Sequence, residues 1–441
     1  MRSLKLAKDL RVLLLIPLLV LALHPFFGFP GIAPVMDAGY LLCLIYLVLA
    51  YPWLKPKGSS RPSAFEWYLL SVIILPPLWV GLCAYREFGQ PVLYGMLAVR
   101  ALSSIAAVLF LGRALRSGFF TLDDVETSLL VLVWGLSFLY IVVEGIFHVP
   151  SARPPIELAT QESKFLPDVP VFGFFYYSFR GFRQRRLRDY LLAVALLGFA
   201  FAFQTGSARV LTLALAFAFL FFVWRWAKLK RLLILLPQLL LGTALLLSAW
   251  YFVMPASFAE RVQGFGDAFG VALTGQPGKE SSANARIVEV LFAAPQIAKH
   301  PMIGNGQISN QWGGGSDEVL PVHFYAADIG LMGVVYQYGL AGLILFSCQY
   351  WFALRAAWRC PAAATSPLLD ATKGYLLYSA LLSIGESVFV FYASTTLFFV
   401  ALLRAIADDT SSGTGGKSPA CLHATQGLVA EAGGGRMWRV T

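Results

Sequence analysis

Long apolar runs alternate with short polar connections along most of the chain. A helix that crosses a membrane needs roughly 20 apolar residues, with about 17–25 tolerated. The sequence predicts twelve spans, of which the sixth, the seventh and the last two are short: Val12–Phe27, Ile32–Leu54, Trp67–Ala84, Val92–Leu111, Thr127–His148, Val169–Phe179, Tyr190–Gln204, Val210–Trp224, Leu232–Met254, Ala326–Trp351, Gly374–Glu386 and Val388–Leu403. This pattern predicts an all-α, polytopic membrane protein.

The basic residues fall on alternate connections between these spans. Basic clusters precede the first span and follow the second, fourth, sixth, eighth and tenth, and the densest is Arg180–Arg188 after the sixth. Because cytoplasmic connections carry an excess of Lys and Arg, we expect both termini to be cytoplasmic. Removing the short sixth span would break this alternation.

Four regions follow from the predicted spans. Residues 1–254 hold spans one to nine, residues 255–325 form a large extracytoplasmic loop, residues 326–407 hold spans ten to twelve, and residues 408–441 form a cytoplasmic tail. Within the loop, Ala283–His300 has helical periodicity and ends before the helix breaker Pro301. The tail is rich in Gly, Ser, Thr and Ala without apolar periodicity, so we expect it to be disordered.

Four ionisable residues fall inside the predicted spans. Asp37, Arg100, Glu144 and Glu386 all lie toward the outer face once the topology is set, Arg100 only marginally. A charge inside a membrane costs roughly 2.5–3.5 kcal/mol on insertion scales, so it persists mostly where it is paired or has a function. Two interpretations remain open: an outward-facing site for an anionic, lipid-linked substrate, or one buried ion-pair network that locks four helices.

Composition narrows the class further. The chain has 441 residues, 58% hydrophobic and 13% charged, whereas about 25% charged is typical of a soluble domain. The net charge of +10 could suggest nucleic acid, but the basic residues sit between apolar runs and are interpreted as topology determinants, so no nucleic-acid partner is expected. The cysteines are scattered and form no C-x-x-C pair, which predicts neither a disulfide framework nor a metal site. The basic start followed by an apolar run is interpreted as an uncleaved first helix.

Further polar residues gather at the predicted outer ends of spans. Arg209 closes the tract QTGSAR before the eighth span, and the long loop carries Arg261 and Arg286. His323 and Asp328 flank the start of the tenth span. An interfacial arginine that snorkels to headgroups, a capping histidine and an aspartate that complements a helix dipole are the plain alternatives. An outer arginine opposes the positive-inside bias, and its planar guanidinium suits a diphosphate.

One loop segment is rich in glycine. Gly304–Gly315 lacks the Gly-Lys-Ser/Thr ending of a phosphate-binding loop. We interpret this segment as a flexible hinge or lid.

Several of these segments occur together in a known family. The tract Thr205–Ala216, the large outer loop with Arg286 and His300–Gly306 (HPMIGNG), and the closing run Asp328–Gly342 resemble the O-antigen ligase and polymerase family. The resemblance covers roughly Leu191 to Phe346 and implies a metal-independent glycosyltransferase of the bacterial cytoplasmic (inner) membrane. Such enzymes use undecaprenyl-diphosphate-linked glycans.

One departure from the family pattern favours its polymerase-like members. Ligases usually begin the last motif with a His-Asn pair about eleven residues before a terminal Gly-x-x-Gly, which is Gly339–Gly342 here. Counting back leads to Asp328, and His323 lies five residues earlier. The ligase histidine is therefore absent from its expected place.

The resemblance also implies roles for the candidate residues. Arg209 and Arg286 would hold the donor diphosphate, with Arg261 a further substrate-binding candidate, and Asp328 would be the general base with His323 as second choice. Glu386 and Arg100 would shape the outer cavity. No cofactor or metal is expected. The expected partners are the lipid-linked oligosaccharide, the lipid bilayer and, as candidates, polysaccharide export and chain-length proteins.

Three functional hypotheses follow from these features. The first is a polymerase that joins undecaprenyl-diphosphate-linked oligosaccharide repeat units at the outer face of the membrane. The second is a ligase that transfers the glycan to lipid A-core or another acceptor. The third is a polysaccharide transporter or flippase, which predicts internal inverted repeats and breaks in helices near the midplane; no repeat is evident in the sequence.

Overall fold

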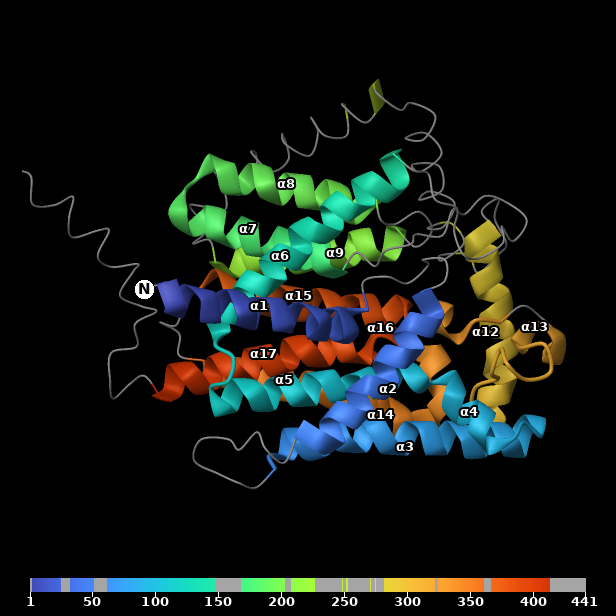
Figure 1. Cartoon of the computed structure of the whole chain (residues 1–441). Helices are drawn as coiled ribbons and strands as arrows, with labels where there is room; N and C mark the ends of the chain where they lie inside the picture. The colour runs from blue at the N-terminus through green and yellow to red at the C-terminus, as the bar shows by residue number, and fades with distance from the viewer. Residues whose placement is uncertain are drawn as a thin grey trace, which may run out of the picture.

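The chain folds as a bundle of helices that run side by side (Figure 1). A computed structural model describes residues 2–24, 32–50, 62–146, 168–202, 208–226, 281–321, 324–360 and 366–412, together with residues 248, 251, 252, 270 and 274. Within these ranges the ordered elements are all helical and no β-strand is present. The predicted all-α class is therefore confirmed.

The helices of the first half are separated mostly by short connections. They are α1 (Arg2–Leu23), α2 (Ile32–Ala50), α3 (Ala64–Phe88), α4 (Val92–Ala98), the 3-10 helix η1 (Arg100–Ser104), α5 (Ile105–Ser117), α6 (Leu122–Tyr140), the π-helix η2 (Ile141–Ile146), α7 (Asp168–Gln184), α8 (Leu187–Ala202) and α9 (Ala208–Trp226). The second half contains α12 (Ser281–Lys299), α13 (Ser316–Val319), the 3-10 helix η3 (Ala326–Ile329), α14 (Gly330–Arg359), α15 (Pro367–Gly385), α16 (Val388–Phe391) and α17 (Ala393–Ser412).

Local capping fixes where the long apolar helices begin and end. At the start of α3, the Ser63 side chain accepts from the Glu66 backbone N–H at 3.3 Å, and the Glu66 carboxylate accepts from the Ser63 N–H at 2.7 Å. This capping box satisfies two backbone donors that the first helical turn leaves without partners. The same helix ends at Gly89, whose left-handed backbone (φ 70°) favours glycine.

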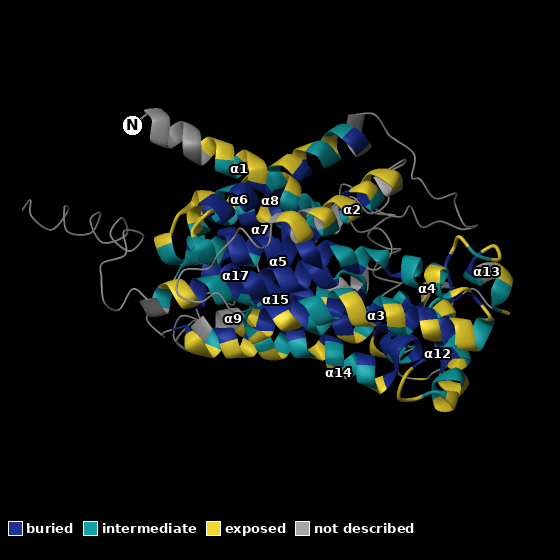
Figure 2. Ribbon diagram, turned by 60° about the horizontal axis from the view of Figure 1, so that its bottom comes forward, coloured by how far each residue is buried: buried dark blue, intermediate teal, exposed yellow. Residues whose placement is uncertain are grey.

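The core lies where α5, α7, α15 and α17 pack together, and buried residues concentrate on these helices (Figure 2). Aromatic side chains fill it: the ring of Phe399 lies 5.1 Å from Phe172 and 4.0 Å from Tyr375, measured between centroids. Gly374 allows α15 to approach α7, because a β-carbon there would lie 2.7 Å from the ring of Phe175. Close helix contact through small residues is typical of membrane bundles.

The outside of the bundle carries large apolar side chains. Phe138 on α6 is 67% exposed and Ile344 on α14 is 66% exposed, and further leucines are exposed on α1, α2 and α3, with Trp67 on α3. Such a surface is costly in water and favourable against lipid. Within the described residues, three helical segments are long and apolar enough to cross a membrane: Ala64–Phe88, Leu122–Val143 and Ala326–Arg359. Counting the bent pair Val92–Ala98 and Arg100–Ser117 as one span gives a fourth.

Several predicted spans differ from the observed helices. The span predicted over Val92–Leu111 is not straight, because α4 and the following helix are bent by 60°. The span predicted over Ala326–Trp351 begins as a 3-10 helix and is interrupted at Gly339. The described residues contain one shorter apolar helical segment, Thr212–Phe221. Most of the ninth predicted span, over Leu232–Met254, lies outside the described residues.

The tail begins later than predicted. The sequence indicated disorder from Asp408, but α17 continues to Ser412. Residues 413–441 lie outside the described part of the chain.

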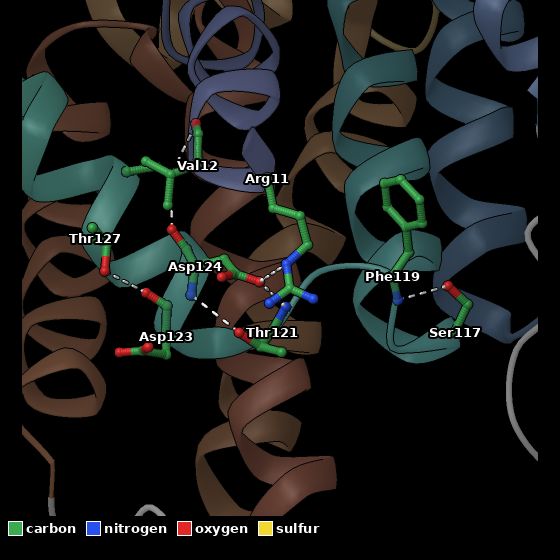
Figure 3. A network of polar contacts seen from close by, with 9 residues as sticks. Arg11, Val12, Ser117, Phe119, Thr121, Asp123, Asp124 and Thr127 are labelled. Carbon is green, nitrogen blue, oxygen red and sulfur yellow. Dashed lines mark hydrogen bonds and ion pairs between the residues drawn. The ribbon is translucent and has the colours of Figure 1, made fainter. Parts of the chain in front are cut away.

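One end of the bundle is held by ion pairs between arginines and buried carboxylates. Among the described residues, such pairs join Arg116 and Arg113 to Glu66, Arg11 to Asp124, Arg180 to Asp189, and Arg183 to Asp370. Figure 3 shows one of them, in which the Arg11 guanidinium of α1 points at Asp124 in the first turn of α6, with Nε 3.1 Å from Oδ2. We call this end the arginine end. The opposite end, where α12, α13 and residues 300–321 lie, we call the loop end.

Candidate functional site

Three of the four ionisable residues of the predicted spans lie at irregular or broken stretches of helix. Arg100 begins η1 at the bend after α4, and Glu144 lies within the π-helix η2. Glu386 follows α15 with an extended backbone (φ −135°, ψ 134°) before α16 begins. A helix break leaves backbone carbonyls and N–H groups unpaired, which is tolerated at membrane depth only where protein or a water-filled cavity surrounds them. The helix breaks therefore indicate a part of the bundle whose role goes beyond the packing of membrane-spanning helices.

Arg100 forms an ion pair and also donates a hydrogen bond to the helix end beside it. Its Nε lies 2.6 Å from Oδ1 of Asp37 on α2, and its Nη1 donates to the carbonyl of Leu97 at 3.0 Å. The carbonyl at the end of α4 thus gains a charged donor in place of the missing helical N–H. Both partners of the pair are more than one-third exposed. An exposed pair of this kind contributes little stability on its own.

Arg286 and Glu386 form the second pair, from segments 100 residues apart in the sequence. Nη2 of Arg286 on α12 lies 3.7 Å from Oε1 of Glu386 at the end of α15. This separation is an ion pair without a direct hydrogen bond. Arg286 remains 29% exposed, so its planar set of donors faces both the carboxylate and the surroundings of the bundle.

The segment before α14 contacts both α12 and the break after α15. We call this meeting of α12, η3 and the end of α15 the junction. The buried Glu289 carboxylate, one turn after Arg286 on α12, accepts from the Tyr325 backbone N–H at 3.0 Å. Across the junction, the Ser387 backbone N–H donates to the carbonyl of Ala327 at 3.0 Å. Asp328 follows Ala327 in η3 and is half-buried, so it lies on the same short segment that contacts the Glu386–Ser387 break.

The HPMIGNG segment (His300–Gly306) fills the interruption of α14. The interruption frees the carbonyls of Tyr336 and Gln337, which accept from the backbone N–H groups of Asn305 (2.7 Å) and Gly306 (3.1 Å). In return, the N–H groups after the interruption donate to residues 301 and 302, at 2.8 and 3.2 Å. The fully buried Asn305 side chain adds a bond to the Tyr336 carbonyl at 3.2 Å. A loop and a broken helix therefore complete each other's hydrogen bonds.

Helix α3 holds the same segment from the other side. The indole N–H of Trp79 donates to the Ile303 carbonyl at 2.7 Å, and Arg86 donates to the Gly304 carbonyl at 2.9 Å. The His300 imidazole lies 3.2 Å from the Glu87 carboxylate. Gly304 is consequently not part of a free hinge or lid as interpreted from sequence. The first residues of the glycine-rich segment are fixed between α3 and α14, and exposed turns begin at Asn310.

The predicted site residues fall into three groups. Arg286, Glu386 and Asp328 meet at the junction of α12, η3 and the end of α15. Arg100 instead pairs with Asp37 on α2, so the four-membered network considered from sequence is divided, in the described residues, between different partners. The other predicted candidates cannot be placed in the site. Arg261 and His323 lie outside the described residues, and for Arg209 and Glu144 only the backbone is described.

Sequence reasoning missed three residues that build the junction. Glu289, Ser387 and Asn305 are all buried polar groups. Glu289 was visible as a lone acid on the apolar side of the predicted helix Ala283–His300, and Asn305 as the polar centre of HPMIGNG. Buried polar groups are hydrogen-bonded in native proteins, so such positions predict a partner but not which one.

Comparisons with known proteins leave the family assignment open. No protein-family model matches the chain, and no curated protein matches it. Among the described residues, no group of three or more His, Cys, Asp or Glu side chains is arranged to hold a metal ion. The resemblance to the O-antigen ligase and polymerase family therefore stays a prediction.

Proposed function

We propose that this protein is a membrane glycosyltransferase that polymerises undecaprenyl-diphosphate-linked oligosaccharide repeat units. The reaction would take place at the outer face of the bacterial cytoplasmic membrane, with the loop end outward and both termini in the cytoplasm. The proposal keeps the topology of twelve spans with a large loop between spans nine and ten. It is supported by the alternation of basic clusters and by helices at nearly all the predicted span positions.

One observation carries the proposal. The segments on which the family resemblance rests, HPMIGNG and Asp328–Gly342, are distant in sequence and are joined by the backbone hydrogen bonds around the α14 interruption. Arg286, the third element of the resemblance, reaches the same end of the bundle through its pair with Glu386. The segments that resemble the family in order and spacing therefore lie at the same end of the bundle and contact one another through the interruption of α14 and the Arg286–Glu386 pair.

The chemistry expected at this junction is glycosyl transfer with a diphosphate leaving group. Arg286 would neutralise the negative charge that develops on the lipid diphosphate, with Arg209 and Arg261 as further candidates. Asp328 would accept the proton of the acceptor hydroxyl as it attacks the anomeric carbon with inversion, and His323 is the alternative base. Glu386 would orient Arg286. The bond to the diphosphate supplies the energy, so no nucleotide is required.

A purified-enzyme assay tests this proposal. Protein in liposomes is supplied with a lipid-diphosphate oligosaccharide, and the products are separated by size on a gel. We expect a ladder of repeats from the natural protein and none from Arg286→Ala, while Arg359→Ala, an exposed arginine at the other end of α14, retains the ladder. If Arg286→Ala makes polymer of normal length at normal membrane abundance, this arginine has no part in the mechanism.

Gene deletion separates polymerase from ligase. Loss of a polymerase leaves single repeat units on the acceptor, whereas loss of a ligase leaves long chains on the carrier lipid. The ligase remains the alternative within the same chemistry, with lipid A-core or another molecule as acceptor.

The helix breaks favour a second class, a polysaccharide transporter or flippase. Interruptions at Gly339, at Arg100 and at Glu386 resemble the discontinuous helices that form transport sites. Liposomes distinguish the two classes: a flippase moves labelled lipid-linked glycan between leaflets and leaves its size unchanged. Transport without any growth in glycan size would replace the polymerase proposal.

A further inference from the structure

A second polar site lies at the arginine end, far along the bundle from the junction described above. A cavity of about 30 Å³ opens there between the start of α3 and the ends of α5 and α17, and its polar lining is Ser63, Glu66, Arg116, Arg404 and Asp408. A space of this size admits water-sized polar groups. The inference drawn from this cavity does not depend on the proposed function.

The acidic group at the base of the cavity is already occupied. One oxygen of the Glu66 carboxylate accepts from the Ser63 backbone at 2.7 Å in the α3 cap. The other oxygen pairs with Arg116 and lies 3.9 Å from Nη1 of Arg113. Two arginines therefore share a single oxygen of a carboxylate that is 3% exposed. The Glu66 carboxylate therefore has little capacity left for a third arginine, and Asp408 is the other acid in the lining.

Arg404 is that third arginine. Its guanidinium lies 4.7 Å above the ring centroid of Phe65 and 5.7 Å from that of Phe352. Among the described residues it donates no hydrogen bond, although a guanidinium carries five N–H donors. Burial lowers the pKa of Arg404, and the positive charges of Arg116 and of α14 lower it further against the opposite effect of Asp408.

Exposed tryptophans place the cavity at the level expected for lipid headgroups. Trp67 follows Phe65 by two residues on α3 and is 60% exposed, and Trp351 precedes Phe352 on α14 and is also exposed. Trp358, one turn past Arg355, is exposed as well. Tryptophan is enriched at the interface between lipid tails and water. The rings on which Arg404 rests are therefore flanked by side chains typical of that interface.

From these observations we propose that the cavity binds the phosphate group of an anionic phospholipid in the adjacent leaflet. Arg404 and Arg116 would donate charge-assisted hydrogen bonds to the phosphate oxygens, and the apolar walls from α3 and α5 would contact the first carbons of the lipid. Basic pockets between membrane helices are known to bind anionic headgroups. The phosphate supplies the acceptors that the Arg404 donors lack within the protein.

Binding of short-chain lipids to the purified full chain in neutral detergent tests this site. Short-chain phosphatidylglycerol is titrated beside short-chain phosphatidylcholine and inorganic phosphate. We expect phosphatidylglycerol to bind most tightly, and Arg404→Gln to raise its Kd by at least about tenfold, as the loss of one strong charged bond implies. The matched control Arg188→Gln, an exposed arginine at the start of α8 that does not line the cavity, should change Kd less than about twofold.

Three results would overturn the proposal. If phosphatidylcholine binds as tightly as phosphatidylglycerol, the site does not select a negatively charged lipid. If inorganic phosphate binds as tightly, the site recognises phosphate and not a phospholipid. An unchanged Kd in a folded Arg404→Gln protein removes the site. If Arg404→Gln does not fold, as judged by its thermal unfolding, Arg404→Lys replaces it. Loss of the planar fork should still weaken binding severalfold, and unchanged binding of that variant contradicts the proposal in the same way.

Discussion

The interruption of α14 makes a sharp prediction about Gly339. This residue has φ 67° and ψ −174°, a backbone conformation open essentially to glycine alone. A β-carbon at this position would lie 2.2 Å from the carbonyl carbon and 2.3 Å from the carbonyl oxygen of Met302. Both atoms belong to backbone, so neither can rotate aside as a flexible side chain would. Gly339→Ala should therefore either strain the interruption or displace the HPMIGNG segment.

The expected cost has two parts. A β-carbon in this region of backbone space costs about 1–3 kcal/mol. Displacing residues 301–306 would weaken the four backbone hydrogen bonds made across the interruption, each with a net value of about 0.5–1.5 kcal/mol. If half of those bonds are lost, Gly339→Ala lowers the free energy of unfolding by about 2–6 kcal/mol.

Denaturant unfolding of the purified protein in mixed micelles measures this difference. Gly135→Ala on α6 is the matched control, because a β-carbon there meets nothing within 4 Å and helix propensity alone should make it neutral or about 0.5–1 kcal/mol more stable. The reasoning is refuted if the two variants have equal stability, since both replace a glycine within a long apolar helix and differ only in backbone conformation and close contacts.

Other predictions concern single polar groups. Asn305→Ala removes the buried amide that donates to the Tyr336 carbonyl and should lower the free energy of unfolding by about 1–3 kcal/mol, whereas Asn310→Ala at an exposed turn should be neutral; equal effects would contradict the role of the amide. Burial raises the pKa of Asp370, with Arg183 opposing, so the folded state binds this proton more tightly than the unfolded state and stability should fall as pH rises past the ordinary aspartate pKa. Asp370→Asn should reduce that slope in a pH series of unfolding measurements, and an unchanged slope would mean that another group titrates. In the gel assay, Asp328→Asn should abolish polymer formation while Asp123→Asn, at an exposed position of the arginine end, leaves it intact; unchanged activity of Asp328→Asn would favour His323 or a substrate-assisted route.

The sequence predicted the existence of most helices because length and apolarity are local properties. The helix predicted over Ala283–His300 is found as α12, displaced by two residues at its start and one at its end. Periodicity records which side of a helix is apolar, and Pro301 stops it. Neither signal required knowledge of the rest of the fold.

Hydropathy and periodicity could not predict the helix breaks. Hydropathy is unchanged when a helix bends by 60° near Arg100 or adopts π geometry near Glu144, since the side chains are the same. The interruption at Gly339 depends on a backbone conformation that the tract Gly339–Gly342 permits but does not demand. The interruption is stabilised by hydrogen bonds with HPMIGNG, and this contact forms only in the folded chain.

The candidate site was predicted as a set of residue types and found as specific pairs. Hydropathy placed Glu386 and Arg100 toward one face, and charge balance suggested that each needs a partner. Which partner depends on tertiary packing: Glu386 pairs with Arg286 from α12, and Arg100 with Asp37 from α2. Glu289 could not be assigned, because the backbone N–H that it accepts from belongs to a segment with no regular pattern.

The most direct measurement of the central claim is where a lipid diphosphate contacts the protein. An undecaprenyl-diphosphate analogue with a photoreactive group beside the diphosphate is irradiated with the protein in liposomes, and labelled peptides are identified by mass spectrometry. We predict labelling on α12 around Arg286 and on residues 324–330, greatly reduced in Arg286→Ala and unchanged in Arg359→Ala. Labelling confined to the arginine end, or equal labelling of the natural protein and Arg286→Ala, would contradict a diphosphate site at the loop end.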